Sequence, residues 1–317
     1  MITTLKPQVD TQIFKHNTRL MGNQFEISVV LEDAPQAMEF IEAAIHEVKR
    51  IENLLTTFEE SSQTNLINKM AGIKPVVVDK EVYQLIERSI RISDLTQGAF
   101  DITYGSLDKK FWNFDTSMTR LPDPDLAKKS VQLINYRNII LNPDDHSVYL
   151  TKAGMRVGFG GIGKGYAAEC AKRVMQESGV EAGIINASGD LTTWGHTPEG
   201  RPWTIGIADP QTRLNVFSEM QLSDMSIATS GDYEKYVIIE GRKYSHTINP
   251  RTGYPVHGIS SVSIISPNAE LCDALTTPVM VMGISKGLHM INQMKNIGCI
   301  IIDGNQKLFT SNNIKLK

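Results

Sequence analysis

A glycine-rich segment that leads directly into a helix pattern is the strongest constraint in this sequence. It reads Val157-Gly158-Phe159-Gly160-Gly161-Ile162-Gly163-Lys164-Gly165-Tyr166. Glycines let bare backbone N–H groups approach a phosphate, and the N-terminus of a helix favours negative charge. Because a lysine also stands at the start of the helix, the segment predicts a binding site for a diphosphate.

Two phosphate-binding motifs fit this segment, each with a defect. Gly158, Gly160 and Gly163 have the spacing of the dinucleotide fingerprint, but that motif belongs to a first βαβ unit and this segment lies in mid-chain. Gly158 and Lys164 nearly match a P-loop, but Gly165 stands where a P-loop needs a hydroxyl for magnesium. The class of nucleotide therefore stays open on this segment alone.

The elements around this segment indicate an α+β fold with mixed or antiparallel sheets and packed helices. Helical periodicity and caps predict helices at residues 37–55, 81–96, 164–178 and 268–282. Strands are predicted at residues 24–31, 183–187, 203–208, 236–240, 262–266 and 299–303, with 236–245 as a hairpin. Residues 105–130 are rich in charges and turns, which predicts a loop.

Composition and charge exclude several classes of protein. The 317 residues carry 32 Lys and Arg against 35 Asp and Glu, so no overall positive field attracts nucleic acid or an anionic membrane. No apolar run reaches the roughly 18–20 residues of a membrane span. The three cysteines, Cys170, Cys272 and Cys299, lie far apart among apolar neighbours and are expected in the core.

No linker divides the chain into separate domains. Residues 1–20 are a polar N-terminal lead, and residues 21–317 are expected to form a single domain. The lead is too polar for a signal peptide. We therefore expect a cytoplasmic protein, or an exported lipoprotein if the sequence lacks its natural start.

Two further clusters carry side chains suited to chemistry. Asp273 and Thr277 are spaced i and i+4 on a predicted helix, so their oxygens share one face. An oxygen-only set suits Mg²⁺, although an Asp and a Thr at this spacing usually face solvent or cap a helix. His246 precedes a turn that contains Arg251. Histidine suits proton transfer near neutral pH, and arginine suits contact with phosphate.

Taken together, these segments resemble the FAD:protein FMN transferases, the ApbE-type flavin transferases. The resemblance is a series of motifs in the same order across nearly the whole chain. They are Met21-Gly22-Asn23, Thr57-Phe58 with Ser61, Ser62 and Asn68, Gly98-Ala99-Phe100-Asp101-Ile102-Thr103, Gly160 to Tyr166, Asn186 to Asp190, Ala228 to Tyr233, Ser245-His246 through Gly253, and Asp273 to Thr277.

The resemblance implies both a fold and a reaction. The implied fold is an intertwined, two-lobed α+β structure. The implied reaction is the Mg²⁺-dependent transfer of FMN from FAD to a threonine hydroxyl of an acceptor flavoprotein, with release of AMP. Acceptors in this family are subunits of membrane redox complexes and soluble reductases.

The resemblance also implies roles for particular residues. His246 is the expected catalytic residue. Mg²⁺ is expected on the main-chain carbonyl of Gly161 and on the side chains of Asp273 and Thr277. FAD is expected to contact Met21, Phe58, Ala99, Phe100, Asp101, Lys164 and Thr247. Phe58 suits stacking on an aromatic ring of FAD, but a phenylalanine in the core is an equally good interpretation.

The chain departs from the family pattern at five positions. Gly158 and Asn249 each replace an Asp, Gly163 replaces Ala, Ser188 replaces Gly and Glu169 replaces Asp. The same pocket would also serve a protein that binds FAD without transfer, or a pyrophosphatase that splits FAD into FMN and AMP. Both alternatives stay open beside the transferase.

Overall fold

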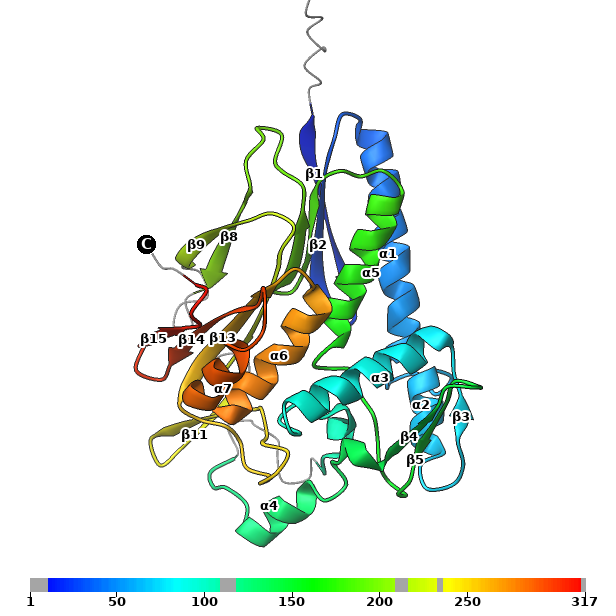
Figure 1. The fold of residues 1–317 in the computed structure, drawn as a ribbon, viewed down its shortest axis with the longest axis vertical. Helices are drawn as coiled ribbons and strands as arrows, with labels where there is room; N and C mark the ends of the chain where they lie inside the picture. The colour runs from blue at the N-terminus through cyan, green and yellow to red at the C-terminus, as the bar shows by residue number, and fades with distance from the viewer. Residues whose placement is uncertain (1–10, 109–117, 209–215, 233–235, 315–317) are drawn as a thin grey trace, which may run out of the picture.

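An eight-stranded antiparallel sheet is the framework of the molecule. The computed structural model describes residues 11–108, 118–208, 216–232 and 236–314. The strand order is β1-β2-β6-β7-β10-β13-β14-β15, and every neighbouring pair is antiparallel (Figure 1). Their bounds are Gln12–Leu20, Asn23–Leu31, Gly183–Ala187, Asp190–Trp194, Ser226–Gly231, Ile259–Ser266, Gly298–Asp303 and Leu308–Thr310. The predicted α+β class is confirmed.

Helices α1 (Ala34–Leu55), α5 (Gly163–Glu177) and α6 (Ala269–Met282) pack side by side on this sheet (Figure 1). Asp33 caps α1, because its carboxylate accepts a hydrogen bond from the backbone N–H of Gln36 at 3.0 Å. The apolar face predicted for α1 is buried throughout: Ala37, Ile41, Ala44, Val48, Ile51 and Leu55. Helix α7 (Ile284–Ile291) follows α6 and packs on it and on β14.

A second group of elements lies beyond the lower end of the sheet in Figure 1. It contains α2 (Gln63–Lys69), α3 (Lys80–Leu95), α4 (Pro124–Ser130), the 3-10 helices η1 (Ile102–Ser106) and η3 (Tyr136–Asn138), and a small sheet of β3 (Val76–Val77), β5 (Ser147–Leu150) and β4 (Ile139–Asn142). The hairpin of β11 (Tyr236–Ile239) and β12 (Arg242–Ser245) returns here much later in the chain. Its Val237 and Ile239 share an apolar cluster with Ala127 and Val131. The chain therefore passes between the two groups more than once.

Most predicted elements are present, but some were missed. Strand β1 lies in the polar lead, where the sequence predicted no element. It is an edge strand, and its mainly polar side chains are typical of one. The predicted loop at 105–130 ends in α4, while residues 109–117 of it lie outside the described residues. The pair of β8 (Trp203–Ala208) and β9 (Val216–Leu222) was predicted only in its first strand.

The cysteine prediction is confirmed, because Cys170, Cys272 and Cys299 are all buried and none is in a disulfide. Among the residues that the structure describes, no helix combines the length and the apolar character needed to cross a membrane.

The turn between β6 and β7 contains a strained serine. Ser188 has φ 57° and Gly189 has φ 100°, a backbone region that favours glycine. Ser188→Gly is therefore expected to raise the free energy of unfolding by about 0.5–1 kcal/mol, measured by urea denaturation. Ser188→Ala keeps the strain and is the control. An equal gain from both variants would show that the strain is not the cause.

Candidate active site

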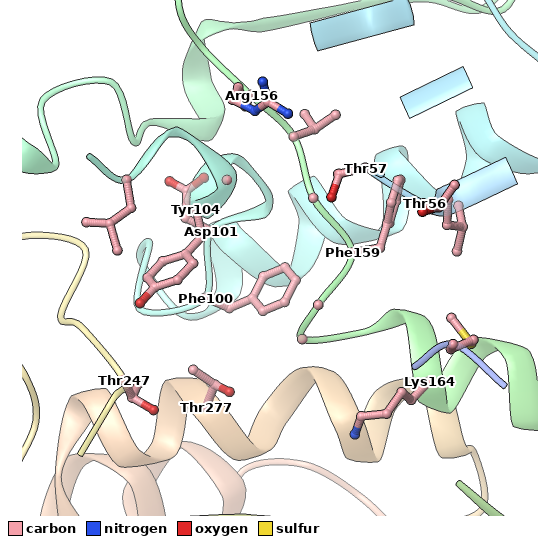
Figure 2. A pocket seen from close by; sticks show the side chains of 18 of the residues that line it. Thr56, Thr57, Phe100, Asp101, Tyr104, Arg156, Phe159, Lys164, Thr247 and Thr277 are labelled. Atoms are coloured by element: carbon pink, nitrogen blue, oxygen red, sulfur yellow. The ribbon is translucent and has the colours of Figure 1, made fainter. Parts of the chain in front are cut away.

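One cavity collects the predicted site residues. Its volume is about 940 Å³, and it is lined by the turn after β1, the end of α1, residues 99–107, the glycine-rich segment, residues 246–250 and Thr277 (Figure 2). Every residue predicted to contact FAD or to act in catalysis lies in its wall, as do Gly161 and Thr277. Of the predicted site residues, only Asp273 does not line the cavity. It lies behind the wall, where it accepts a hydrogen bond from the backbone N–H of Gly165. The cavity is within the range of about 300–1,000 Å³ that small-molecule sites occupy.

Asn68 holds the start of the glycine-rich segment. Its side-chain amide accepts a hydrogen bond from the backbone N–H of Val157 at 2.7 Å and donates one to the Val157 carbonyl at 3.0 Å. The next residue, Gly158, donates its N–H to the carbonyl of Ile102 at 3.0 Å. These bonds fix the segment against η1, so its last glycines lie at the start of α5.

Gly165 explains why this segment is not a P-loop. A Cβ atom at this position would lie 2.2 Å from the carbonyl oxygen of Ala269 and 2.8 Å from the Cβ atom of Asp273. Helix α5 therefore packs too closely on α6 for any side chain here. The backbone N–H of Gly165 donates to a carboxylate oxygen of Asp273 at 3.0 Å. Asp273 thus satisfies a backbone donor at the N-terminus of α5, where such groups have no partner within the helix.

Two buried carboxylates, those of Asp190 and Asp273, feel the positive charge of Lys164 in the cavity wall. Lys164 pairs with Asp190, whose other carboxylate oxygen accepts from the backbone N–H of Thr229 at 3.3 Å. Burial raises the pKa of Asp273 to about 7, and the negative charge of Asp190 adds to the rise while Lys164 opposes it. Burial also raises the pKa of Asp190, against the attraction of Lys164. With both carboxylates ionised the cluster has an excess negative charge, which favours binding of a cation beside it.

If Asp273 is a metal ligand, the affinity of the protein for Mg²⁺ is expected to fall about tenfold for each pH unit below about 7. Protonated Asp273 cannot ligate a metal, so below its pKa of about 7 each metal ion must displace a proton. Titration calorimetry between about pH 5.5 and pH 8 measures this slope, with Asp273→Asn as the control that should lack it. If the Mg²⁺ affinity of the unmodified protein did not depend on pH, Asp273 would not be a metal ligand with a raised pKa.

Thr276 and Thr277 differ in how their hydroxyls are used. The Thr276 hydroxyl donates to the carbonyl of Asp273 at 2.9 Å and shares a hydrogen bond with Ser230 at 2.7 Å. The Thr277 hydroxyl makes no such bond within the described part of the chain and lies in the cavity wall. Gly161, Asp273 and Thr277 together offer only oxygen ligands, and these fit the preference of Mg²⁺. Helix α6 continues past Pro278 to Met282, so it carries Asp273 and Thr277 as one rigid unit.

The end of the cavity that contains His246 is built on the segment after β12. His246 is half-buried in the wall, and Thr247 beside it is buried. The hydroxyl of Tyr104 accepts a hydrogen bond from the backbone N–H of Ile248 at 3.1 Å. Burial raises the pKa of Tyr104 to about 12, which keeps the phenol protonated. In Figure 2, Thr247 and Thr277 lie below the glycine-rich segment, and Lys164 lies farther along at the start of α5.

The expected flavin contacts fall into two kinds. Phe58 is 93% exposed although it lines the cavity, so the interpretation of Phe58 as a core residue is wrong. Ala99, Phe100 and Asp101 are buried. The Asp101 carboxylate accepts hydrogen bonds from the N–H and the hydroxyl of Thr103 at 2.8 and 2.6 Å, and from the Tyr136 N–H at 3.0 Å. Asp101 therefore shapes the cavity wall by holding η1 in place.

The departures from the family pattern are accommodated locally. The side chain of Asn249 accepts from the N–H of Arg251 at 2.9 Å, which an Asp would also do. Glu169 reaches the N–H of Ala269 at 2.9 Å and so supports the start of α6. A Cβ atom at Gly158 would meet nothing closer than the Cα atom of Gly105 at 3.9 Å, so this part of the cavity is simply wider.

Sequence reasoning missed several residues of the site. The sequence placed Asp190 in a motif but assigned it no role. In the structure Asp190 is a buried acid that forms an ion pair with Lys164. Tyr104 carried no signal beyond its place shortly after the Gly98–Thr103 motif. Arg156 lines the cavity and directly precedes the glycine-rich segment, and no local pattern marked it.

Comparisons with known proteins show the family to which the chain belongs. The model of the ApbE family matches residues 21–301. An FAD:protein FMN transferase of Klebsiella pneumoniae is 29% identical over 97% of this chain and 95% of its own length, and one of Escherichia coli K12 is 28% identical over 89% and 82%. The crystal structure of the ApbE protein from Thermotoga maritima superposes with a TM-score of 0.85 at 29% identity, covering 95% of this chain and 97% of that one. The chain belongs to the ApbE family.

Proposed function

We propose that this protein transfers FMN from FAD to a threonine hydroxyl of an acceptor flavoprotein, with Mg²⁺ as cofactor and AMP as the other product. The observation that carries the proposal is that one cavity brings the expected site residues together. It gathers the lysine, the glycines, His246 and Thr277 from distant parts of the chain, with Asp273 directly behind. Its volume of about 940 Å³ suits one FAD molecule. The names of the matching relatives support the same reaction.

The reaction is a phosphoryl-type displacement at the FMN-side phosphorus. The acceptor oxygen forms a bond to this phosphorus, the bond from phosphorus to the AMP oxygen breaks, and the hydroxyl proton goes to the imidazole of His246. A positioned base of this kind contributes about 10²–10⁴-fold to the rate. When bound, Mg²⁺ supplies positive charge that neutralises the diphosphate oxygens.

The chain's own residues supply binding and orientation. Lys164 lies at the start of α5, where its ammonium and the backbone N–H groups favour the negative diphosphate. Tyr104 holds the backbone of Ile248 and so fixes the segment that carries His246. Gly161 and Thr277 would hold Mg²⁺ from the cavity side and Asp273 from behind.

Phe58→Ala is expected to weaken FAD binding by about 5–30-fold with little change in protein stability. A stacked aromatic ring is worth about 1–2 kcal/mol, and the Phe58 side chain is too exposed to support the core. Quenching of FAD fluorescence measures the affinity. Ile73→Ala, another exposed apolar side chain that is outside the cavity, is the control. An unchanged FAD affinity in Phe58→Ala would remove Phe58 from the binding site.

The decisive experiment mixes the purified protein with FAD, Mg²⁺ and a candidate acceptor that has an exposed threonine. A fluorescent acceptor band on a denaturing gel, absent with EDTA and in His246→Ala, is the expected result. AMP and free FMN in solution without a labelled acceptor would indicate a pyrophosphatase, once several acceptors have been tried. Intact bound FAD with neither product would indicate a binding protein.

A further inference from the structure

A second cavity adjoins the first. Its volume is about 720 Å³, and it lies between α4, the end of α3 and the turn that contains Pro250 and Arg251. Asp101 and Pro250 line both cavities, so they are neighbours with a common wall. Neither the flavin site nor the metal ligands account for this second cavity.

Four cationic side chains line the second cavity: Lys128, Lys129, Arg137 and Arg251. The amine of Lys128 donates to the carbonyl of Arg251 at 2.7 Å, and the guanidinium of Arg251 donates to the carbonyl of Gln97. Within the described residues the Lys129 side chain makes no hydrogen bond or ion pair. No carboxylate there lies within ion-pair distance of Lys128, Lys129 or Arg251. Among the described residues, the charges of Lys128, Lys129 and Arg251 therefore line the cavity without a carboxylate in ion-pair contact.

The other charged groups of this cavity leave the balance positive. The guanidinium of Arg137 lies over the ring of Tyr136 and 3.8 Å from the carboxylate of Asp94, in an exposed and hence weak pair. Two carboxylates line the cavity. Asp101 is buried and its oxygens are occupied by Thr103 and Tyr136, whereas Asp125 is exposed on the first turn of α4. Four cations against two acids favour an anionic occupant.

This charged wall is mechanically tied to the catalytic segment. A Cβ atom at Gly253 would lie 1.8 Å from the carbonyl oxygen of Ala127, so the turn and α4 are in direct backbone contact. Arg251 anchors the same turn to the end of α3 through Gln97. His246 stands only four residues before Pro250, and both line the first cavity. An occupant of the second cavity would therefore contact the turn at Pro250, which lies four residues after His246 in the chain.

We propose that the second cavity binds an acidic segment of the acceptor protein close in sequence to the threonine that receives FMN. This inference rests on the proposed function, because the acceptor must bring a hydroxyl to His246. In the proposed function FAD occupies the first cavity, where Lys164 and the metal ligands bind its phosphates. The reaction therefore requires no second nucleotide in the second cavity. A peptide chain that enters beside residues 246–250 passes the second cavity, and carboxylates on it complement Lys128, Lys129 and Arg251.

The test measures peptide binding separately from transfer. Two fluorescent peptides each carry one central threonine in a Gly, Ser and Ala background, flanked either by aspartates or by asparagines. Fluorescence anisotropy is read with the full protein, FAD and EDTA, so that no transfer occurs. The aspartate peptide is expected to bind about fivefold to tenfold more tightly than the asparagine peptide, and raising the salt from about 50 to about 300 mM should remove most of this difference.

Variants then locate the charge that the peptide recognises. Lys129→Glu, which breaks no hydrogen bond, and Lys128→Gln should each reduce the preference for aspartate at least about threefold. Lys286→Glu on α7 makes the same charge change as Lys129→Glu at an exposed position outside both cavities, and it should leave the preference intact. Equal binding of the two peptides, no binding of either, or a preference that survives the Lys129 and Lys128 changes would each overturn the proposal.

The two proposals can fail separately. If the aspartate peptide binds as expected but no acceptor becomes flavinylated with Mg²⁺, the function is wrong while the ligand class of the cavity stands. If acceptors are flavinylated equally well whether their flanking acids are present or replaced by amides, the transferase stands and the second cavity is not its docking site.

Discussion

Asp273→Asn is expected to lower Mg²⁺ affinity more than about 100-fold and to abolish FMN transfer at millimolar Mg²⁺. Loss of a residue that only supports a metal ligand costs about 10–100-fold in affinity, and loss of an anionic ligand itself costs more. Asparagine keeps the volume between α5 and α6, and its amide oxygen can still accept the N–H of Gly165. The protein should therefore fold, which thermal unfolding checks.

The measurement is the rate of FMN transfer as a function of Mg²⁺ concentration, with calorimetry for the affinity itself. Asp144→Asn is the matched control. Asp144 is exposed in a turn that is far in sequence from Asp273, and its side chain makes no hydrogen bond among the described residues. Thr277→Val should give a smaller loss than Asp273→Asn, since it removes a neutral ligand. Wild-type Mg²⁺ dependence in Asp273→Asn would exclude Asp273 from the metal set.

His246→Ala is expected to slow transfer by about 10²–10⁴-fold while FAD and Mg²⁺ still bind. An alcohol that keeps its proton is a poor nucleophile, so removing the base affects the chemical step. Single-turnover labelling of the acceptor measures that step, and quenching of FAD fluorescence shows that the site is intact. A large loss of FAD affinity instead of rate would make His246 a binding residue.

His257→Ala is the matched control for this change. His257 is exposed, contacts Tyr244 edge to face at 5.7 Å, and does not line the first cavity. It should therefore keep the full transfer rate. If both histidine variants lost activity equally, the loss would come from disturbance of the β12 region and not from a missing base.

The sequence was most informative where one element carries its own signal. Helices α1, α3, α5 and α6 lie within a few residues of their predicted ranges, because each has a periodic apolar face or a clear start and stop. Strands β7 and β10 gave no such signal. The polar side chains of Thr192, Thr193 and Ser226 are buried there, so the alternation that marks a half-exposed strand is absent.

The candidate site divides in the same way. The glycines before a lysine, the histidine before a turn and the Asp–Thr pair are local patterns that the sequence shows directly, and the resemblance to the family supplied their expected roles. Asp190 was not recognised as the partner of Lys164, because 26 residues separate them and β7 has to form before they meet. Tyr104 and Ile248 are 144 residues apart, and no local pattern links them.

By itself, the sequence determined the helices, the family pattern and the kinds of group available for chemistry, because these depend on residues close together in the chain. Only the tertiary structure decided that Asp273 lies behind the cavity wall, that Phe58 is exposed in that cavity, and that Lys128 and Arg251 form a cationic cavity beside it. Such facts depend on the packing of α5 on α6 and of α4 on the turn at Gly253. Packing arises from contacts between distant residues, and no short stretch of sequence encodes them.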